Sequence, residues 1–407
     1  MGSVLSVRLY PLTQQQLIKM FRLKISVIVK LMFLTIPAVA QKNPNLLLKW
    51  KIVGELPADS GQQISLGVAG PVTGYHKNVL FIAGGANFPA GMPWEGGVKK
   101  FYTTVNVYFK KRHKLKLSSQ SFSLPYSIAY VASCSTPFGV LYAGGESEKG
   151  ISDKVWLMIW DDRAGEILFK SLPVLPVAVS NASAILNGTT VFIAGGETAA
   201  HTTSQLLALD LVNIQAGWNK LADIPQPVSH TVVTAIPGKT GDKIFLCGGR
   251  KKNNSGISDF YNSVFVYDVI TNTWEEKKAL PYALSAGTGI VCDAENILLF
   301  GGDKGIVFHK TETLIAAINA EKDPVKKQEL IQEKNKLQSE HPGFSNEVLI
   351  YNIENDAWNI AGTIPFDTPV TTTAVQWKSG IIIPSGEIKA GVRSPNILGV
   401  KILQKNK

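Results

Sequence analysis

The feature that most constrains the fold is an apolar run that ends in a glycine pair and recurs along the chain. Each complete copy has four apolar residues before the pair, and most copies follow one another at a spacing near 50 residues. A repeat of this length indicates ring-forming or stacked units rather than one layered core. The complete copies end at Gly84-Gly85, Gly144-Gly145, Gly195-Gly196, Gly248-Gly249 and Gly301-Gly302, and a degenerate sixth ends at Ser385-Gly386.

A second pattern alternates with the first. It consists of an aromatic residue, five further residues, and then Leu or Ile followed by Pro. Two alternating signatures with this period are typical of the kelch repeat, in which each unit is one four-stranded blade of a β-propeller. The copies run from Trp50 to Pro57, Phe169 to Pro176, Trp218 to Pro225, Trp274 to Pro281 and Trp358 to Pro365, and Leu124-Pro125 lacks the aromatic residue.

The two ends of the chain complete one blade between them. Trp50 to Pro57 has the pattern of the tail of a blade that lacks its earlier strands, and only the strand from Ile397 to Leu403 follows the sixth mark. We therefore expect Leu46 to Val53 to supply the missing outer strand, which leaves no open edge in the ring. The sequence predicts an all-β, six-bladed kelch-type propeller over residues 41–407. Coincidental glycine pairs in a β-sandwich would not alternate strictly with the Leu-Pro or Ile-Pro pairs of the second pattern, which we call the Pro marks.

One stretch interrupts the repeat. Residues 303–345 separate the fifth glycine pair from its next strand, which is far more chain than the other blades have there. Helices are predicted over 311–320 and 324–339, the second with Asp323 as its N-cap and Pro324 in its first turn. We predict a charged helical insertion within the fifth glycine-marked blade. It either covers one mouth of the ring or forms a solvated surface lobe, and the sequence favours neither.

The first 40 residues read as a targeting signal. A basic segment from Met20 to Lys24 precedes an apolar run that ends in Ala38-Val39-Ala40, the small-residue pattern that a signal peptidase reads. Lys30 interrupts the run, which is short for a membrane anchor. We predict a signal peptide over residues 1–40, with Met20 as an alternative start, no membrane span in the mature chain, and a periplasmic location.

The net charge of the chain does not indicate nucleic-acid binding. The chain has a formal charge of +10, but residues 1–40 hold five basic residues and no acid, so the remainder is at +5. That value is ordinary for a chain of this length. The three cysteines cannot all pair with one another, so we predict no disulfide framework. None has a Cys or His neighbour at metal-ligand spacing, so no metal site is predicted.

Candidate site residues follow the glycine pairs. Loops after the second strands of a propeller emerge on one face around its channel, so these residues converge. Asp303 and Glu387 follow the fifth and sixth marks. Aromatic walls with a few charged groups suit the binding of a sugar. We predict substrate-binding roles for Asn87, Trp94, Glu95, Glu146, Glu197 and Arg250.

The loop after the sixth mark is the richest, and it runs Gly386-Glu387-Ile388-Lys389-Ala390-Gly391-Val392-Arg393. A carboxylate such as Glu387 accepts a proton, and an arginine such as Arg393 grips a carboxylate by two parallel hydrogen bonds. A loop salt bridge without function would explain the same pair. In the first loop Trp94 stands beside Glu95, and a long rigid turn would explain that loop equally well.

Two segments resemble the N-acetylneuraminate epimerase family. They are Gly-Gly-Ala-Asn-Phe-Pro…Met-Pro-Trp-Glu-Gly-Gly and Gly-Glu-x-Lys-x-Gly-x-Arg, and the order of the blades resembles the cyclically permuted branch of that family. The resemblance covers roughly residues 45–405. The family pattern Asn-Gly-Glu-Ala-Lys-Pro-Gly is replaced here at Ser385, Ile388 and Ala390, and the charged residues are spared. The resemblance implies an isomerase without a cofactor that interconverts the α and β anomers of sialic acid, a small acidic sugar.

The resemblance also implies roles for individual residues. Glu387 would be the acid/base residue of ring opening, and Arg393 would bind the sugar carboxylate or tune that glutamate. The second proton-transfer group stays unassigned, with Glu95, Glu146 and Glu197 as geometric candidates. A non-catalytic glycan-binding or protein-binding propeller is the main alternative, because a fold does not fix a function. A copper radical oxidase would need a Tyr–Cys pair and two His ligands in the channel. A glycosidase is left open by the acid count, but the Asp-box repeats of sialidases are missing.

Overall fold

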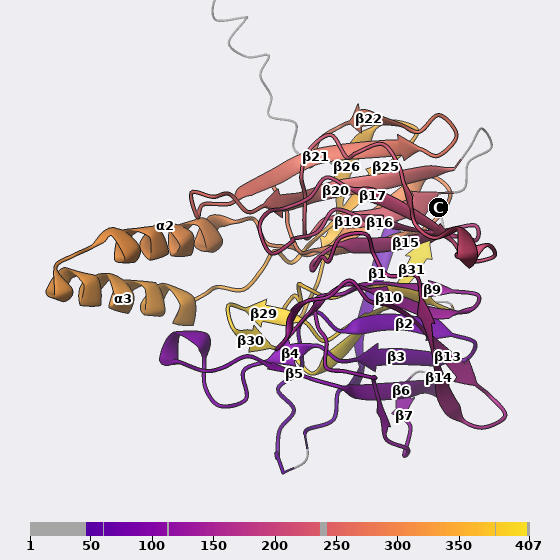
Figure 1. The fold of residues 1–407 in the computed structure, drawn as a ribbon, viewed down its shortest axis with the longest axis horizontal. Coiled ribbons are helices and arrows are strands. Elements are labelled where there is room, and N and C mark those ends of the chain that lie inside the picture. The colour runs from indigo at the N-terminus through magenta and orange to yellow at the C-terminus, as the bar shows by residue number, and fades with distance from the viewer. Residues whose placement is uncertain (1–45, 60, 112–113, 237–241, 379, 405–407) are drawn as a thin grey trace, which may run out of the picture. The chain divides into compact units, whose positions relative to one another are not determined.

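The computed structural model describes residues 46–404 apart from residues 60, 112–113, 237–241 and 379. The predicted signal segment, residues 1–40, lies outside the described residues. The described chain folds into six main antiparallel sheets arranged as the blades of a propeller (Figure 1). The six-bladed all-β prediction is therefore confirmed.

Each blade runs from an innermost strand at the channel to an outer strand at the rim. The first three blades are formed by β2 (Val72–His76), β3 (Val79–Ala83), β6 (Thr104–Lys111), β7 (Lys114–Leu117) and β8 (Phe122–Ser123); β9 (Ala132–Thr136), β10 (Gly139–Ala143), β13 (Val155–Asp161) and β14 (Glu166–Leu172); and β15 (Ser183–Asn187), β16 (Thr190–Ala194), β17 (Leu206–Asp210) and β18 (Asn219–Lys220). The last three are formed by β19 (Val232–Ile236), β20 (Lys243–Lys251), β21 (Asp259–Asp268) and β22 (Thr273–Lys277); β23 (Thr288–Val291), β24 (Asn296–Phe300), β25 (Glu347–Asn352) and β26 (Ala357–Thr363); and β27 (Val375–Trp377), β28 (Gly380–Pro384), β31 (Asn396–Gln404) and β1 (Leu46–Glu55).

The sixth blade is closed by the two ends of the described chain. Strand β1 pairs antiparallel with β31, with Leu47 opposite Leu403 and Glu55 opposite Asn396. The Trp50 ring meets the Phe300 ring of the fifth blade edge-on, with 5.8 Å between centroids. The predicted closure is confirmed, and it leaves the ring without an open blade.

The hydrophobic core is divided among the interfaces between blades. Six clusters of buried residues each join two consecutive blades, including the interface between the sixth blade and the first. Leu141 of the second blade and Ile193 of the third belong to one such cluster, and both are fully buried. Every blade is thus stabilised by both of its neighbours.

The Trp of one repeat contacts the backbone beside the Pro mark of the preceding repeat. The indole nitrogens of Trp218, Trp274 and Trp358 each donate a hydrogen bond to a backbone carbonyl of the preceding blade, over 2.8–3.0 Å. In every case that carbonyl lies two residues before the Leu or Ile of a Pro mark. The Trp and Pro marks recur together because they form one inter-blade contact.

The helical insertion consists of α2 (Ile306–Ala320) and α3 (Pro324–Ser339), between β24 and β25. Helix α3 has the predicted bounds, and the Asp323 side chain accepts hydrogen bonds from Val325 N and Lys326 N. Helix α2 begins at Ile306 instead of residue 311. Its N-cap, Gly305, has φ of 79° and makes no side-chain cap hydrogen bond, so the sequence contains no capping signal at this point.

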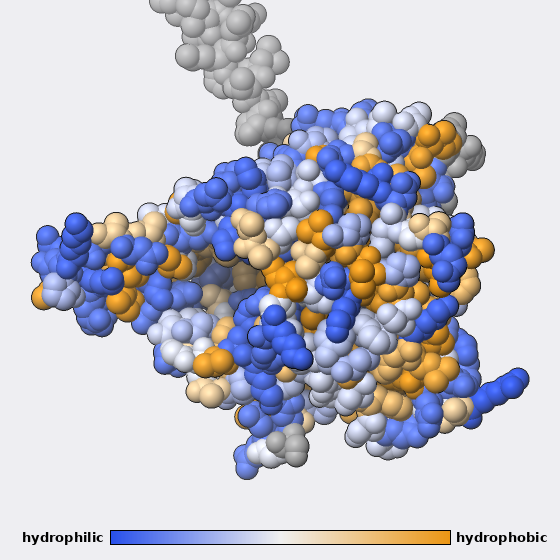
Figure 2. Space-filling model, in the orientation of Figure 1, coloured by the Kyte–Doolittle hydropathy of each residue, from blue (hydrophilic) through white to orange (hydrophobic). Residues whose placement is uncertain are grey.

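The two helices form an arm on the side of the ring that carries three short hairpins (Figure 1). These hairpins follow the first, second and sixth glycine marks: β4 (Ala86–Asn87) with β5 (Lys100–Phe101), β11 (Glu146–Ser147) with β12 (Gly150–Ile151), and β29 (Glu387–Lys389) with β30 (Val392–Arg393). Figure 2 shows a largely hydrophilic arm with a hollow where it meets the ring. No helix in the described part of the chain is long and apolar enough to cross a membrane. Cys134 and Cys247 are buried free thiols, and Cys292 is a half-buried one.

Candidate active site

The residues that follow the glycine marks lie at equivalent positions around one mouth of the ring. In each blade this residue forms an antiparallel bridge with a residue that precedes the innermost strand of the same blade. The six bridges repeat around the channel. The bridged residues after the marks are Ala86, Glu146, Glu197, Arg250, Asp303 and Glu387.

Next to these bridges, six backbone hydrogen bonds close a ring. Each member donates its N–H to the carbonyl of the equivalent residue in the preceding blade, over 2.7–3.0 Å. All six have φ between 51° and 63°, a left-handed conformation that is costly for bulky side chains. The members, one from each blade, are Gly70, Tyr130, Asn181, His230, Ala286 and Thr371.

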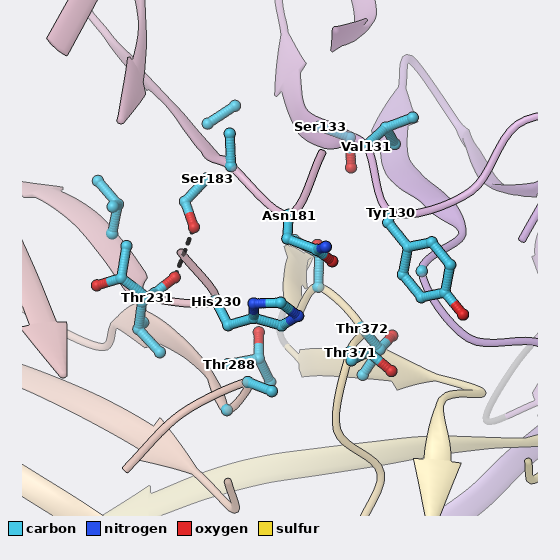
Figure 3. Close-up of a pocket in the computed structure, with 18 of the residues that line it drawn as sticks. Tyr130, Val131, Ser133, Asn181, Ser183, His230, Thr231, Thr288, Thr371 and Thr372 are labelled. Carbon is cyan, nitrogen blue, oxygen red and sulfur yellow. Dashed lines mark hydrogen bonds between the residues drawn. The ribbon is translucent and has the colours of Figure 1, made fainter. Parts of the chain in front are cut away.

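A cavity of about 110 Å³ adjoins this ring on the channel side (Figure 3). It is lined by ring members and by the first residues of the innermost strands. In Figure 3 His230 and Asn181 lie in the middle of the view, while the phenol of Tyr130 points away from them. Glu387 and Arg393 are not among the residues that line it. The charged mouth and the polar cavity therefore meet at the ring but are distinct.

Glu387 and Arg393 face one another across the β29–β30 hairpin. Nη2 of Arg393 lies 3.6 Å from Oε2 of Glu387, and Oε1 accepts a hydrogen bond of 2.8 Å from Gly391 N. The Arg393 guanidinium lies over the Phe88 ring, 4.7 Å from its centroid. Only 4% of the Arg393 side chain is exposed, yet its Nε and Nη1 have no hydrogen-bond partner in the described chain. Because buried guanidinium nitrogens require acceptors, the pair is suited to an anionic ligand.

A second charged cluster surrounds Glu197, three blades away and so on the opposite side of the mouth. Its Oε1 accepts a hydrogen bond of 2.9 Å from Ser229 Oγ and lies 3.7 Å from Arg250 Nη2. Its Oε2 accepts one of 3.2 Å from Asn181 Nδ2. Nη2 of Arg250 lies 3.2 Å from Nε2 of His230. Because a guanidinium only donates, Nε2 is the acceptor, and the neutral imidazole carries its proton on Nδ1.

Burial and neighbouring charges give these groups different proton affinities. Burial and the positive charge of Arg250 lower the pKa of His230 to about 3, so its imidazole is neutral at physiological pH. Burial raises the pKa of Glu197, but His230, Arg250 and two donated hydrogen bonds outweigh this effect, and the net pKa is lowered. Burial raises the pKa of Asp303. The mouth thus holds carboxylates that differ in their tendency to ionise.

Tyr130 lies beside a third charged group of the mouth. That group is Lys99 with Glu146, whose Nζ and Oε1 are 3.7 Å apart. Nζ of Lys99 is also 4.9 Å from the centroid of the Tyr130 ring. Burial raises the pKa of Tyr130 to about 12, against the opposing positive charge of Arg393. The phenol is therefore protonated at neutral pH.

Asn87 is engaged within the protein. Its Nδ2 donates a hydrogen bond of 2.8 Å to the Gly67 carbonyl, and its Oδ1 accepts one of 2.7 Å from the Tyr102 hydroxyl. The side chain is 5% exposed. These contacts hold the start of the first loop in place.

Trp94 and Glu95 lie in a short turn, η1 (Pro93–Glu95). The Glu95 side chain is exposed, and its Oε2 accepts a hydrogen bond of 3.2 Å from Met92 N in the same turn. Trp94 approaches the Glu387 loop, because a Cβ added at Gly391 would lie 3.2 Å from its indole. The structure thus brings Trp94 near the Glu387–Arg393 pair and leaves Glu95 facing solvent.

The helical arm contacts the mouth from two sides. The Phe308 ring of α2 lies 4.4 Å from the guanidinium carbon of Arg250. The Glu312 carboxylate accepts hydrogen bonds of 2.8 and 2.7 Å from the backbone N and Oγ of Ser258 in the fourth blade. From α3, Nδ2 of Asn335 donates a hydrogen bond of 3.2 Å to the carbonyl of Trp94. These contacts favour a cover over part of the mouth rather than a free lobe.

Several residues at the mouth escaped the sequence predictions. Tyr130 and Lys99 belong to no motif that distinguishes them. His341 follows α3, is buried, and lies among the charges of Asp303, Glu387 and Lys389, but the insertion has no counterpart in the other blades. A positional signal for Tyr130 does exist, because the ring member stands five residues after the Pro mark in four of the six blades.

Fold and site together define a class: a six-bladed β-propeller with carboxylate, phenol and guanidinium groups gathered at one mouth. Within the described residues, no group of three or more His, Cys, Asp or Glu side chains is placed to hold a metal ion. The family model for N-acetylneuraminate epimerase matches residues 172–407, which is more than half of the sequence. The chain belongs to this family.

Curated relatives carry the same family name. The N-acetylneuraminate epimerase of Brucella melitensis biotype 1 is 27% identical over 234 residues, which cover 56% of this chain and 58% of that protein. Those of Vibrio vulnificus and Salmonella typhimurium are 25% identical over 228 and 226 residues, covering 55% of this chain and 58% and 56% of theirs. The matched part of the chain thus spans less than two thirds of the length of these relatives.

Proposed function

We propose that this protein is a sialic acid mutarotase that interconverts the α and β anomers of N-acetylneuraminate by acid/base opening and closure of the sugar ring, without a cofactor. Membership of the epimerase family supports the substrate class. The observation that carries the proposal is the buried Arg393 guanidinium, which stands beside the Glu387 carboxylate and has two nitrogens without a hydrogen-bond partner among the described residues.

The chemistry of the sugar suits this pair. The anomeric carbon of N-acetylneuraminate bears both a hydroxyl and a carboxylate. Arg393 binds the carboxylate through its unpaired nitrogens, and Glu387, 3.6 Å from Arg393, takes the proton of the anomeric hydroxyl. The bond from the anomeric carbon to the ring oxygen breaks, and a second group protonates that oxygen. Rotation beside the new keto carbon presents its other face, and closure reverses both proton transfers.

The principal alternative is a non-catalytic propeller that binds a glycan or a protein through the same mouth. Binding without acceleration of anomer exchange would identify that case. The proposed place of action is the periplasm, reached through the signal in residues 1–40.

The proposal is tested by proton NMR on freshly released α-sialic acid, at a pH where spontaneous exchange is slow. The wild-type protein should speed the approach to equilibrium. Glu387→Gln should reduce the rate by about 100-fold or more, because one positioned general base contributes 10²–10⁴-fold. Binding of the sugar by the Gln variant, measured by calorimetry, should change only a few-fold.

A matched control removes a carboxylate elsewhere. Glu333 is exposed on α3, so Glu333→Gln should retain the wild-type rate. A wild-type protein that binds the sugar and leaves its anomerisation rate unchanged would contradict the mutarotase proposal and favour the binding propeller.

A further inference from the structure

The proposed reaction needs a second proton-transfer group close to the first. Both oxygens that exchange protons are bonded to the same anomeric carbon, so groups on opposite sides of the mouth are poorly placed. Glu197 is three blades from Glu387, and both of its oxygens accept hydrogen bonds. Glu146 is paired with Lys99, and Glu95 is exposed in its own turn. The three carboxylates singled out by the sequence are therefore poor choices.

We infer that the phenol of Tyr130 is the second proton-transfer group, an inference that rests on the proposed mutarotase function. The backbone holds this residue from both sides. Its N–H donates a hydrogen bond of 2.7 Å to the Gly70 carbonyl, and its carbonyl accepts one of 2.8 Å from Asn181 N. The charges of Arg393 and Glu387 both act on the phenol, and Lys99 Nζ lies 4.9 Å from the centroid of its ring. Tyr130 thus lies beside the pair that would hold the substrate.

Gly70, next to Tyr130 in the backbone ring, leaves room for the Tyr130 side chain because it has no side chain of its own. A Cβ added at Gly70 would lie 2.5 Å from Tyr130 N and 2.6 Å from its Cδ1, closer than real contacts allow. Gly70 itself has φ of 63°, which a glycine adopts without strain. A side chain at Gly70, the ring member of the first blade, would therefore collide with Tyr130, the ring member of the second blade.

The charges around the phenol suit a group that gives up a proton and takes it back. Four charged residues act on it: Arg393 and Lys99 favour the phenolate, and Glu387 and Glu146 oppose it. The phenol is protonated when the substrate arrives, as a general acid must be. The two cations would stabilise the phenolate that forms during ring opening.

The proton transfers balance over the full cycle. On opening, Glu387 gains the anomeric hydroxyl proton, the bond from the anomeric carbon to the ring oxygen breaks, and Tyr130 gives its proton to that oxygen. The open keto acid then lies between a protonated carboxyl and a phenolate. On closing, the phenolate takes back a proton as the ring oxygen attacks, and Glu387 returns one to the new anomeric hydroxyl.

The test is the steady-state rate of anomer exchange for Tyr130→Phe, measured by the NMR assay beside wild type and Glu387→Gln. We expect kcat to fall about 100-fold or more with KM within threefold, because Phe keeps the ring, the burial and the backbone but removes the proton. Tyr75→Phe is the matched control, since Tyr75 lines the far part of the channel and should keep the wild-type kcat. Thermal unfolding checks that each variant is folded.

A second pair of variants covers a Tyr130→Phe protein that fails to fold. Lys99→Met removes the cation 4.9 Å from the ring and should lower kcat about 10-fold, while Lys99→Arg should keep it. The inference is overturned if Tyr130→Phe keeps kcat within threefold or raises KM alone. It is also overturned if Asp303→Asn, and not Tyr130→Phe, lowers kcat about 100-fold. A wild-type protein without activity would overturn the proposed function as well. If the wild type is active and Glu387→Gln is inactive, the proposed function stands, and an unaffected Tyr130→Phe then overturns only the inference about Tyr130.

Discussion

At the scale of single residues, two arginines organise the charged side chains of the mouth. Arg393 stands beside Glu387 and Tyr130, and Arg250 stands beside Glu197 and His230. The second group is held by internal hydrogen bonds, whereas in the first, two guanidinium nitrogens have no partner in the part of the chain that the structure describes. The first arginine is therefore free to bind a ligand, and the second mainly organises its own side of the mouth.

His230 makes stability depend on pH. Its pKa is about 3 in the folded protein and near 6.5 when unfolded, so the unfolded chain binds the proton more readily. This contribution to stability is complete above pH 6.5 and is lost as the pH falls towards 3. His230→Asn, which tolerates the left-handed backbone, should reduce the stability lost between pH 7 and 4 by on the order of 3 kcal/mol.

Urea unfolding at pH 7 and pH 4 measures this difference. Part of the acid sensitivity should survive in the Asn variant, because Glu197 also has a lowered pKa and loses its contribution on protonation. A variant whose stability falls as far as that of wild type would show that the imidazole is not the source.

At the scale of elements, the helical arm is an attachment to the mouth rather than a part of the ring. Glu312 anchors α2 by two hydrogen bonds to Ser258, and Phe308 covers Arg250. Every described residue of the two helices is at least partly exposed to solvent. The arm is thus held by a few specific contacts and not by a hydrophobic core of its own.

Removing that anchor should loosen the cover without unfolding the propeller. We expect Glu312→Ala to increase hydrogen exchange in α2 and to raise KM for the sugar several-fold, with kcat little changed. Glu329→Ala, which removes an exposed carboxylate of α3, is the control. Unchanged exchange in α2 together with an unchanged KM would contradict a covering role.

The elements differ in how far the sequence predicts them. Helix α3 is predictable because Asp323 and Pro324 form a start signal, whereas α2 starts after an uncapped glycine and its first residues, Ile306 to Phe308, read equally well as a strand. The glycine marks predict the bridged residues at the mouth because the turn that follows each second strand needs them. The residue types of the backbone ring give no signal, since its six members share a conformation but no residue type, and only their spacing from the Pro marks, five residues in four of the six blades, points to them.

At the scale of the whole molecule, stability rests on closure. Each of the six hydrophobic clusters spans two blades, so a blade that loses its outer strand weakens both neighbours. Strand β1 supplies this outer strand to the sixth blade and carries Trp50 onto Phe300 of the fifth. The closure is therefore both a hydrogen-bonded seam and a packing contact.

Deleting residues 46–55 should expose the edge of β31 and leave part of two clusters uncovered. We expect a large fall in melting temperature and a tendency to associate through the open edge. Circular dichroism and size-exclusion chromatography measure the two effects. A synthetic peptide of residues 46–55 should restore part of the stability by adding back the strand. A deletion variant that melts at the wild-type temperature as a monomer would contradict this role.

The six backbone hydrogen bonds at the mouth all run in the same sense around the channel, each blade donating to the one before it. Such a homodromic circuit lets every peptide group polarise the next, so its bonds strengthen cooperatively. It also has no first or last member, and no amide in it can open without breaking the loop. The six amide protons should therefore exchange with solvent at one common rate, as a single unit assembled from every blade of the molecule.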